Sequence, residues 1–215
     1  LLRDRFGRFY EVPKSLALRG HHVRGVCLKF WTEGVDPPLS RRCLENVEWE
    51  SFHLNWNWPA AITRYYRWLR NIAGELRPEV IVGASDAMHI MMAANLSRNM
   101  DAPLVVDLYD DFESYGTARF PGIKKGLQYA VAKASAVSTV STNLEAKVKQ
   151  KYRATGTIRT IPNAVCPEIF RPIDKSLARQ KLGLSQNGVL IGTAGALSAA
   201  RGINTLFNAF EKLSR

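Results

Sequence analysis

The feature that most constrains the fold of this chain is a regular alternation of short apolar segments with longer amphipathic ones. The segment "PEVIVGAS" is short and apolar over successive residues, "PLVVDLYDD" repeats this pattern, and "AVSTVS" is a third candidate strand. This composition is typical of strands buried on both faces, as in parallel sheets covered by helices. Helices are predicted after the three segments, at 86–99, 121–134 and 142–152. The sequence therefore predicts an α/β fold with a mostly parallel sheet and helices on both faces.

The first third of the sequence continues this alternation. Gly20 ends one helical segment and Pro59 begins another, and both residue types favour those positions. The predicted order is a helix at 7–20, a strand at 21–30, a polar loop at 33–42, a strand at 47–54 and a helix at 59–76.

A proline-spaced segment divides the chain. Pro162, Pro167 and Pro172 follow an alternating apolar segment. Proline fixes φ and donates no backbone hydrogen bond, so this stretch is predicted to run extended and outside a sheet. The predicted organisation is a first domain at 1–166, a linker at 167–185 and, at 186–215, the strand "GVLIGTAG", a loop and a helix that open an incomplete second domain.

The charge of the chain favours an anionic partner. Thirty Lys and Arg against nineteen Asp and Glu give a formal net charge of +11. Nucleic acid, a phosphorylated small molecule and an acidic lipid surface all suit this charge, and so does an ordinary solvated surface. The sequence has no helix-turn-helix spacing and no aromatic-basic strand motif, so nucleic acid is not expected as a partner.

Several other classes lack their sequence signals. Cys27, Cys43 and Cys166 are far apart and form no Cys-x-x-Cys pair, which argues against a disulfide framework or a zinc site and favours a reducing cytoplasm. No strand is followed by G-x-G-x-x-G, and G-x-x-x-x-G-K-[ST] is absent, so dinucleotide oxidoreductases and P-loop enzymes are disfavoured. No run of apolar residues is long enough to span a bilayer.

Four motifs in order resemble one family. "RFGRFYEVPKSLALRGHHV" resembles the acceptor-side loop and first helix of family 4 glycosyltransferases of the GT-B type, and "AVSTVSTNLEAKV" is similar to their strand and helix before the linker. "IPNAVCPEIFRP" resembles their "IPNGVD…F.P" joint, and "GTAGALSAARGINTLFNAFEKL" resembles the "G-R-L…K-G…LL-A" opening of their second domain. The resemblance covers residues 5–215.

The resemblance implies a GT-B fold of two Rossmann-like domains with the active site between them. The first domain binds a glycan or lipid-linked acceptor, and the second binds a nucleotide-diphosphate sugar, which is the donor substrate. The family transfers the sugar with retention and without a cofactor or an essential metal. The E-x7-E segment of the donor side is absent from this sequence, so we expect a fragment that is inactive alone. The alternative is a non-catalytic binding or scaffold domain.

Donor-site residues are carried over from the second-domain motif. Gly195 and Arg201 are expected to bind the donor diphosphate, because backbone N–H groups and fixed cations stabilise the charge that develops on the leaving group. Ala196 stands where the motif has arginine. The alternative for Arg201 is a cap on a surface loop.

Acceptor-site residues are expected near the first helix. Gly7 lets substrate approach the backbone, and Arg8 is expected to face an anionic acceptor. The family's first strand needs five or six apolar residues before this loop, where this sequence has only Leu1 and Leu2.

Further candidates follow two apolar strands. Asp110 is expected to be catalytic, in a position where family members have His-Asp or Arg-Asp and this chain has Tyr109-Asp110. Asp111 and Glu113 are expected to bind the acceptor, and His89 is a second catalytic candidate. The alternatives are that these acids cap a turn and that His89 caps or packs a helix.

The helix at 59–76 bears on the basic charge. On a helical wheel Trp68 lies among arginines, opposite the apolar face. Residues 56–70 are therefore predicted to contact an acidic membrane surface, with the protein cytoplasmic and peripheral at the inner face of the membrane. The alternative is an ordinary amphipathic helix whose Trp68 is covered by a loop.

Overall fold

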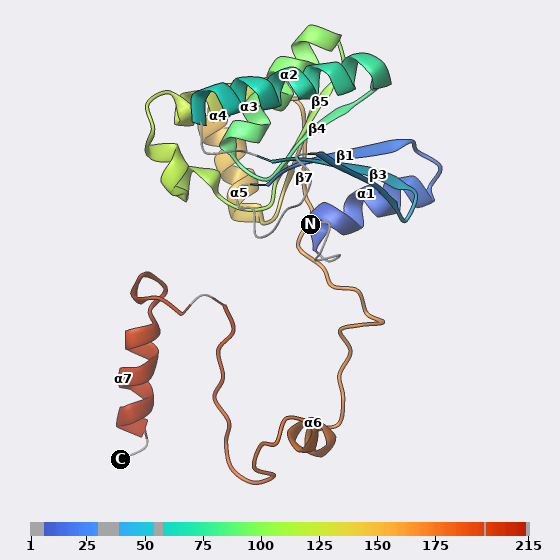
Figure 1. The fold of residues 1–215 in the computed structure, drawn as a ribbon. Coiled ribbons are helices and arrows are strands. Elements are labelled where there is room, and N and C mark those ends of the chain that lie inside the picture. The colour runs from blue at the N-terminus through green and yellow to red at the C-terminus, as the bar shows by residue number, and fades with distance from the viewer. Residues whose placement is uncertain (1–6, 30–38, 54–57, 196, 214–215) are drawn as a thin grey trace. The chain divides into compact units, whose positions relative to one another are not determined.

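The computed structural model describes residues 7–29, 39–53, 58–195 and 197–213 (Figure 1). The chain forms two compact units, Leu1–Cys166 and Pro167–Arg215. Each unit is described by itself.

One three-stranded sheet of the first unit consists of β1 (Val23–Lys29), β2 (Leu39–Leu44) and β3 (Val47–His53), in the order β1-β3-β2. β1 runs parallel to β3, whereas β2 is antiparallel to it. The predicted loop at 33–42 is therefore wrong over its last four residues. Glu45 and Asn46 have positive φ values of 51° and 64°, as a two-residue hairpin turn requires, and this turn brings the polar segment back along β3.

A four-stranded sheet confirms the predicted parallel arrangement. It consists of β4 (Ile81–Gly83), β5 (Leu104–Leu108), β6 (Ala136–Thr139) and β7 (Thr157–Thr160), in sequence order and all parallel. Helices connect these strands, since parallel neighbours need a crossover. The α-helices of the first unit are α1 (Arg8–Leu18), α2 (Trp58–Leu76), α3 (Ala87–Met100), α4 (Ile123–Lys133) and α5 (Thr142–Lys147). Two short 3₁₀ helices, η1 (Phe112–Ser114) and η2 (Gly116–Arg119), precede α4, and a π-helical segment, η3 (Val148–Tyr152), continues α5.

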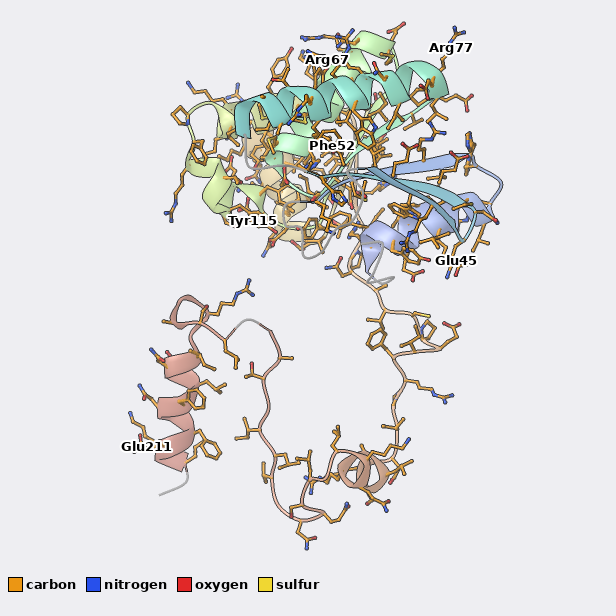
Figure 2. The ribbon with its side chains drawn as sticks, viewed as in Figure 1. Glu45, Phe52, Arg67, Arg77, Tyr115 and Glu211 are labelled. Atoms are coloured by element: carbon orange, nitrogen blue, oxygen red, sulfur yellow. The ribbon has the colours of Figure 1, made fainter. Side chains whose placement is uncertain are left out.

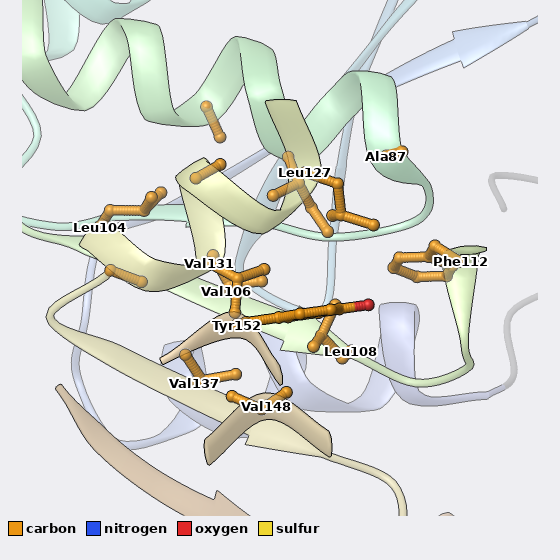
Figure 3. Close-up of a cluster of buried hydrophobic side chains, with 14 of the residues drawn as sticks. Ala87, Leu104, Val106, Leu108, Phe112, Leu127, Val131, Val137, Val148 and Tyr152 are labelled. Atoms are coloured by element: carbon orange, nitrogen blue, oxygen red, sulfur yellow. The ribbon is translucent and has the colours of Figure 1, made fainter. Parts of the chain in front are cut away.

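The largest hydrophobic core lies on one face of the four-stranded sheet (Figure 3). Leu104, Val106 and Leu108 are buried, while the residues between them are only half-buried, as expected for side chains that alternate between two faces. α3, α4 and α5 cover this face through side chains such as Ile90 and Leu127.

α1 and α2 pack on opposite faces of the three-stranded sheet. Tyr10 of α1 packs with Val47 and Trp49, whereas α2 packs on Phe52 of the same strand. The cluster under α2 also includes Ile81 of β4, so this helix contacts both sheets. The predicted apolar face of the helix is confirmed, because its central residues Tyr65, Leu69, Ile72 and Ala73 are buried.

Trp68 departs from the wheel prediction. Its ring centroid lies 5.5 Å from that of Phe52 and 5.8 Å from that of Tyr65, so it packs toward the sheet and not among the outer arginines. Figure 2 shows Arg67 projecting outward from α2 and Phe52 beneath the helix. A large aromatic ring at the boundary of an apolar face gains more by packing against two other rings than by exposure. Residues 56 and 57 of the predicted membrane segment lie outside the described residues.

In the described part of the chain β1 and β4 are edge strands of their sheets, as are β2 and β7. β1 pairs only with β3 and β4 only with β5, so the described strands form two sheets and not one. Val82 of β4 is 56% exposed, and Val26 of β1 is 37% exposed. Leu1 and Leu2 lie outside the described residues.

The second unit contains α6 (Lys175–Lys181), a short turn η4 (Ala199–Arg201) and α7 (Ile203–Leu213). The helix predicted after the loop is present, but the strand "GVLIGTAG" is not formed at 188–195. Val189, Leu190 and Ile191 are exposed, because a strand needs a neighbouring strand and the described part of this unit offers none.

No helix among the described residues is both long and apolar enough to cross a bilayer.

Candidate functional site

The carboxyl ends of β4, β5 and β6 meet at one edge of the four-stranded sheet. Parallel strands place the loops that follow them side by side, and ligands of α/β folds bind at this edge. Asp86 and His89 follow β4, Asp110 follows β5, and Ser141 follows β6. The two predicted catalytic residues, His89 and Asp110, therefore lie at the same edge of the sheet.

His89 and Asp86 form a pair at the start of α3. Asp86 is the N-cap of the helix, and its carboxylate accepts a hydrogen bond from the backbone N–H of His89 at 3.0 Å. His89 Nδ1 lies 2.8 Å from the other carboxylate oxygen. Burial by itself raises the pKa of Asp86, but its hydrogen bonds with His89 outweigh this effect and lower the pKa. The cap is Asp86 and not His89, whose ring packs edge-on against Tyr65 of α2 at 5.8 Å between ring centroids, as the packing alternative for His89 predicted.

Asp110 is exposed at the end of β5 and is held by its neighbours. Its carboxylate accepts hydrogen bonds from the backbone N–H of Asp111 at 2.7 Å and from the hydroxyl of Tyr115 at 3.0 Å. Burial and the hydrogen bonds with Tyr109 and Asp110 raise the pKa of Tyr115, which therefore remains a donor. Tyr109 also packs edge-on against Phe9 of α1, at 4.7 Å between ring centroids. The carboxylate is thus oriented while remaining accessible.

Asp111 and Glu113 take part in an internal ion network. Lys147 Nζ lies 2.7 Å from each carboxylate oxygen of Asp111 and 3.1 Å from Glu113. Lys151 and Gln128 bind the two oxygens of Glu113 at 2.5 Å and 2.6 Å. This network joins η1 to α4, α5 and η3. The side chain of Glu113 is only 6% exposed, so it is much less accessible to an acceptor than Asp110.

The Glu113 carboxylate is strongly stabilised in its charged form. Burial by itself raises its pKa, but hydrogen bonds from Lys151, Gln128 and Lys147 lower the pKa from 4.5 to about 2. Burial also disfavours the charged form of Lys147, and hydrogen bonds with Asp111 and Glu113 nevertheless raise its pKa.

Arg8 connects the start of α1 to the end of the sheet. Its guanidinium lies 2.9 Å from Asp107 on β5 and donates to the carbonyl of Ile161 at 2.7 Å and to Asn163 at 3.2 Å. Ser138 of β6 donates to the same carboxylate. The Arg8 side chain is 9% exposed, so in this conformation its charge is directed inward and not toward solvent. The role predicted for it with an anionic acceptor is untested.

Gly7 precedes α1 as its N-cap residue. Its φ of 82° lies in a region that residues with a side chain rarely adopt, which accounts for glycine here. Its carbonyl accepts from the backbone N–H groups of Tyr10 and Glu11.

Gly195 and Arg201 are brought together within the second unit. Both line a pocket of about 290 Å³ at the start of α7, together with Thr193, Gly202 and Ile203. Gly195 has a φ of 131°. A cation and a helix N-terminus beside one pocket suit an anionic group. Ala196 lies outside the described residues.

Sequence reasoning missed several residues of this region. Asp86 carried a readable signal, because Asp before a helical segment is a favoured N-cap. The partners Tyr115 and Lys147 carried none, since they meet Asp110 and Asp111 only through the tertiary fold. Within the described ranges, no group of three or more His, Cys, Asp or Glu side chains is arranged to hold a metal ion.

The parallel sheet flanked by helices, with polar residues gathered at its carboxyl edge, agrees with the Rossmann-like fold that the resemblance to GT-B glycosyltransferases predicted. The sequence model of the glycosyl transferase 4-like domain matches residues 8–164, and the chain belongs to this family.

Individual relatives agree with this assignment. The D-inositol 3-phosphate glycosyltransferase of Stackebrandtia nassauensis is 36% identical over 90 residues, which are 41% of this chain and 20% of that protein. The solved sucrose-phosphate synthase of Thermosynechococcus elongatus aligns with a TM-score of 0.60 and 14% identity, over 82% of this chain and 46% of its own. An E. coli structure described as trehalose-6-phosphate bound with UDP-2-fluoro glucose aligns with a TM-score of 0.51 and 14% identity, over 82% and 51% of the two chains. The chain spans about half the length of these solved structures.

Proposed function

We propose that this chain supplies the acceptor-binding half of a retaining glycosyltransferase, which transfers a sugar from a nucleotide-diphosphate sugar to a glycan or lipid-linked acceptor. The observation that carries this proposal is the family match over 8–164 combined with the exposed, oriented carboxylate of Asp110 at the carboxyl edge of the sheet. Envelope polysaccharide or glycolipid assembly is the setting in which we place it.

The proposed chemistry divides between the two units. The bond between the anomeric carbon and the diphosphate oxygen breaks, and the diphosphate leaves with the bonding electrons. The acceptor oxygen forms the new bond on the same face of the sugar. Arg201, Gly195 and the start of α7 stabilise the leaving charge, since fixed donors lower the barrier most where charge develops. No cofactor and no metal is assigned a role.

Asp110 and His89 act on the acceptor in this proposal. The Asp110 carboxylate accepts a hydrogen bond from the attacking hydroxyl and orients it. When Nδ1–H of His89 donates to Asp86, Nε2 is the ring atom that can accept the hydroxyl proton. Asp111 and Glu113 stabilise the loop that carries Asp110 through Lys147.

The test is sugar transfer by the polypeptide of the complete reading frame, with UDP-glucose as donor and D-inositol 3-phosphate as the first acceptor. These probes follow from what the relatives are named for. The 215-residue chain alone is expected to show no transfer. Asp110→Asn is expected to lower kcat by about 100-fold or more, in the range of a lost acid–base or orienting group.

Asp101→Asn is the matched control. Asp101 is exposed at the other end of α3 and has a φ of 52°, a conformation that Asn also adopts. The substitution Asp101→Asn should leave the rate of sugar transfer unchanged. If the two variants transfer sugar equally well, Asp110 has no role in catalysis.

The second candidate is a non-catalytic binding domain with the same fold. Ala196 replaces the arginine of the donor motif, and Arg8, Asp111 and Glu113 are engaged within the protein. Equilibrium binding of UDP-glucose by the complete polypeptide, without transfer to a panel of acceptors, would favour this candidate.

A further inference from the structure

An uninterrupted basic segment with exposed aromatic residues follows the candidate site. Residues 114–144 contain no Asp or Glu, and their cations are Arg119, Lys124, Lys125 and Lys133. All four are exposed, and in the part of the chain that the structure describes none has an ion-pair partner. The segment therefore presents uncompensated positive charge on and just before α4.

Two large aromatic side chains lie within this segment. Phe120 is 66% exposed and Tyr129 is 61% exposed. Tyr129 lies four residues from Lys125 and from Lys133, so the three share one stripe of α4. The opposite side of α4 is buried through Leu127, Ala130 and Val131, which fixes the direction of the stripe away from the sheet. Exposed aromatic rings between cations are typical of surfaces that enter the headgroup region of a bilayer.

The neighbouring helices extend the basic surface. α2, α3 and α4 lie in one layer (Figure 1), and α3 contacts both of the others. The three helices carry seven Lys and Arg but only one acid, Glu75. Arg67 and Arg70 of α2 line an open hollow of about 710 Å³ together with Glu75, so two cations and one acid face this space.

We infer that the outer face of the α2–α3–α4 layer docks the protein on an anionic bilayer, with Phe120 and Tyr129 inserted at headgroup level. This surface differs from the segment predicted from the sequence, because Trp68 packs inward and the exposed aromatic residues lie at α4 instead. Attraction between the exposed lysines and acidic lipids acts at long range and brings the protein to the bilayer. The two aromatic rings then make apolar contacts with the bilayer, which a soluble polyanion does not offer. The inference is independent of sugar transfer.

Vesicle co-sedimentation of the 215-residue chain tests the inference. The probe is phosphatidylcholine vesicles with and without phosphatidylglycerol. Binding is expected only to vesicles with the anionic lipid and is expected to weaken with added salt. Lys124→Gln/Lys125→Gln should weaken partitioning about 25-fold, at about fivefold for each cation near the surface.

Two further variants separate charge from insertion. Phe120→Ser/Tyr129→Ser should weaken partitioning roughly tenfold, and the loss should persist at high salt because it is apolar. Lys175→Gln/Lys181→Gln removes the same charge from α6, where both lysines are exposed, and should change partitioning less than about twofold. All substituted side chains are exposed, so circular dichroism is expected to be unchanged.

Three results would overturn the inference. One is equal binding to vesicles with and without phosphatidylglycerol. Another is equal weakening by the two lysine double variants, which would indicate attraction by net charge alone. The third is binding to double-stranded DNA that is tighter than vesicle binding and depends on Lys124 and Lys125, which would assign this face to nucleic acid.

Discussion

Glu113→Gln tests the ion network that stabilises the loop carrying Asp110. The pKa of Glu113 is lowered from 4.5 to about 2 in the folded protein. Taken in full, this shift contributes about 3 kcal/mol to the free energy of unfolding at neutral pH. Lys151 is 51% exposed, so solvent screens its attraction to Glu113. The contribution of the Glu113 shift to the free energy of unfolding is therefore smaller than this full value. The expected loss in the free energy of unfolding at neutral pH is about 1–2 kcal/mol.

The pH dependence of this loss has a definite sign. Because the pKa is lower in the folded state, the stabilisation is present above the unfolded pKa of 4.5 and disappears as the pH falls toward about 2. The unsubstituted chain should therefore lose more stability than Glu113→Gln between these two pH values. Below about pH 2 the two proteins should converge.

Urea unfolding followed by tryptophan fluorescence is the assay. All five tryptophans precede Pro167, so the signal reports on the first unit. Glu79→Gln is the control, because Glu79 is exposed, and it is expected to change stability by less than about 0.5 kcal/mol. Equal stability of the two variants at neutral pH, or parallel pH profiles for Glu113→Gln and the unsubstituted chain, would refute the reasoning.

Two further substitutions test the packing of the first unit. Arg8→Met leaves the nearly buried carboxylate of Asp107 without its cation and is expected to cost about 3 kcal/mol in urea unfolding, whereas Arg19→Met at the exposed end of α1 should cost less than about 0.5 kcal/mol. Equal costs would exclude a structural role for the Arg8–Asp107 pair. Gly25→Ala places a new Cβ about 2.4 Å from the Trp49 ring and is expected to cost about 1–3 kcal/mol and to shift the fluorescence maximum. Gly74→Ala in α2 meets no atom within 4 Å and should be neutral or stabilising by up to about 1 kcal/mol, so a larger loss there would contradict this steric account.

The parts of the fold that local pattern determines were predictable. The apolar run that forms β5 and the apolar face of α2 follow from hydrophobic pattern, which needs no knowledge of tertiary partners. β2 was missed because Arg41 and Arg42 give it the composition of a loop, while its strand conformation comes from pairing with β3. The strand "GVLIGTAG" was predicted for the converse reason, since its composition suits a strand but the described residues offer it no neighbour.

The candidate site was predictable in position but not in connectivity. Asp110 and His89 follow apolar strands, and strand ends are readable from the sequence. The engagement of Arg8 with Asp107, and of Asp111 with Lys147, depends on residues 99 and 36 positions apart meeting in space. Charge in a sequence therefore identifies candidates, whereas the fold decides which of them remain open to a ligand.

The position of α2 over two separately hydrogen-bonded sheets has a consequence for how the first unit opens. Among the described residues no strand pairing joins β1 to β4, and the contacts between the two sheets are made by side chains such as those of the α2 cluster and the Arg8–Asp107 pair. We expect the amides of β1 and β3 to exchange with solvent independently of those of β5 and β6, because cooperative opening units often coincide with hydrogen-bonded structural units. Local opening of the N-terminal sheet would then leave the strand end that carries Asp110 in place.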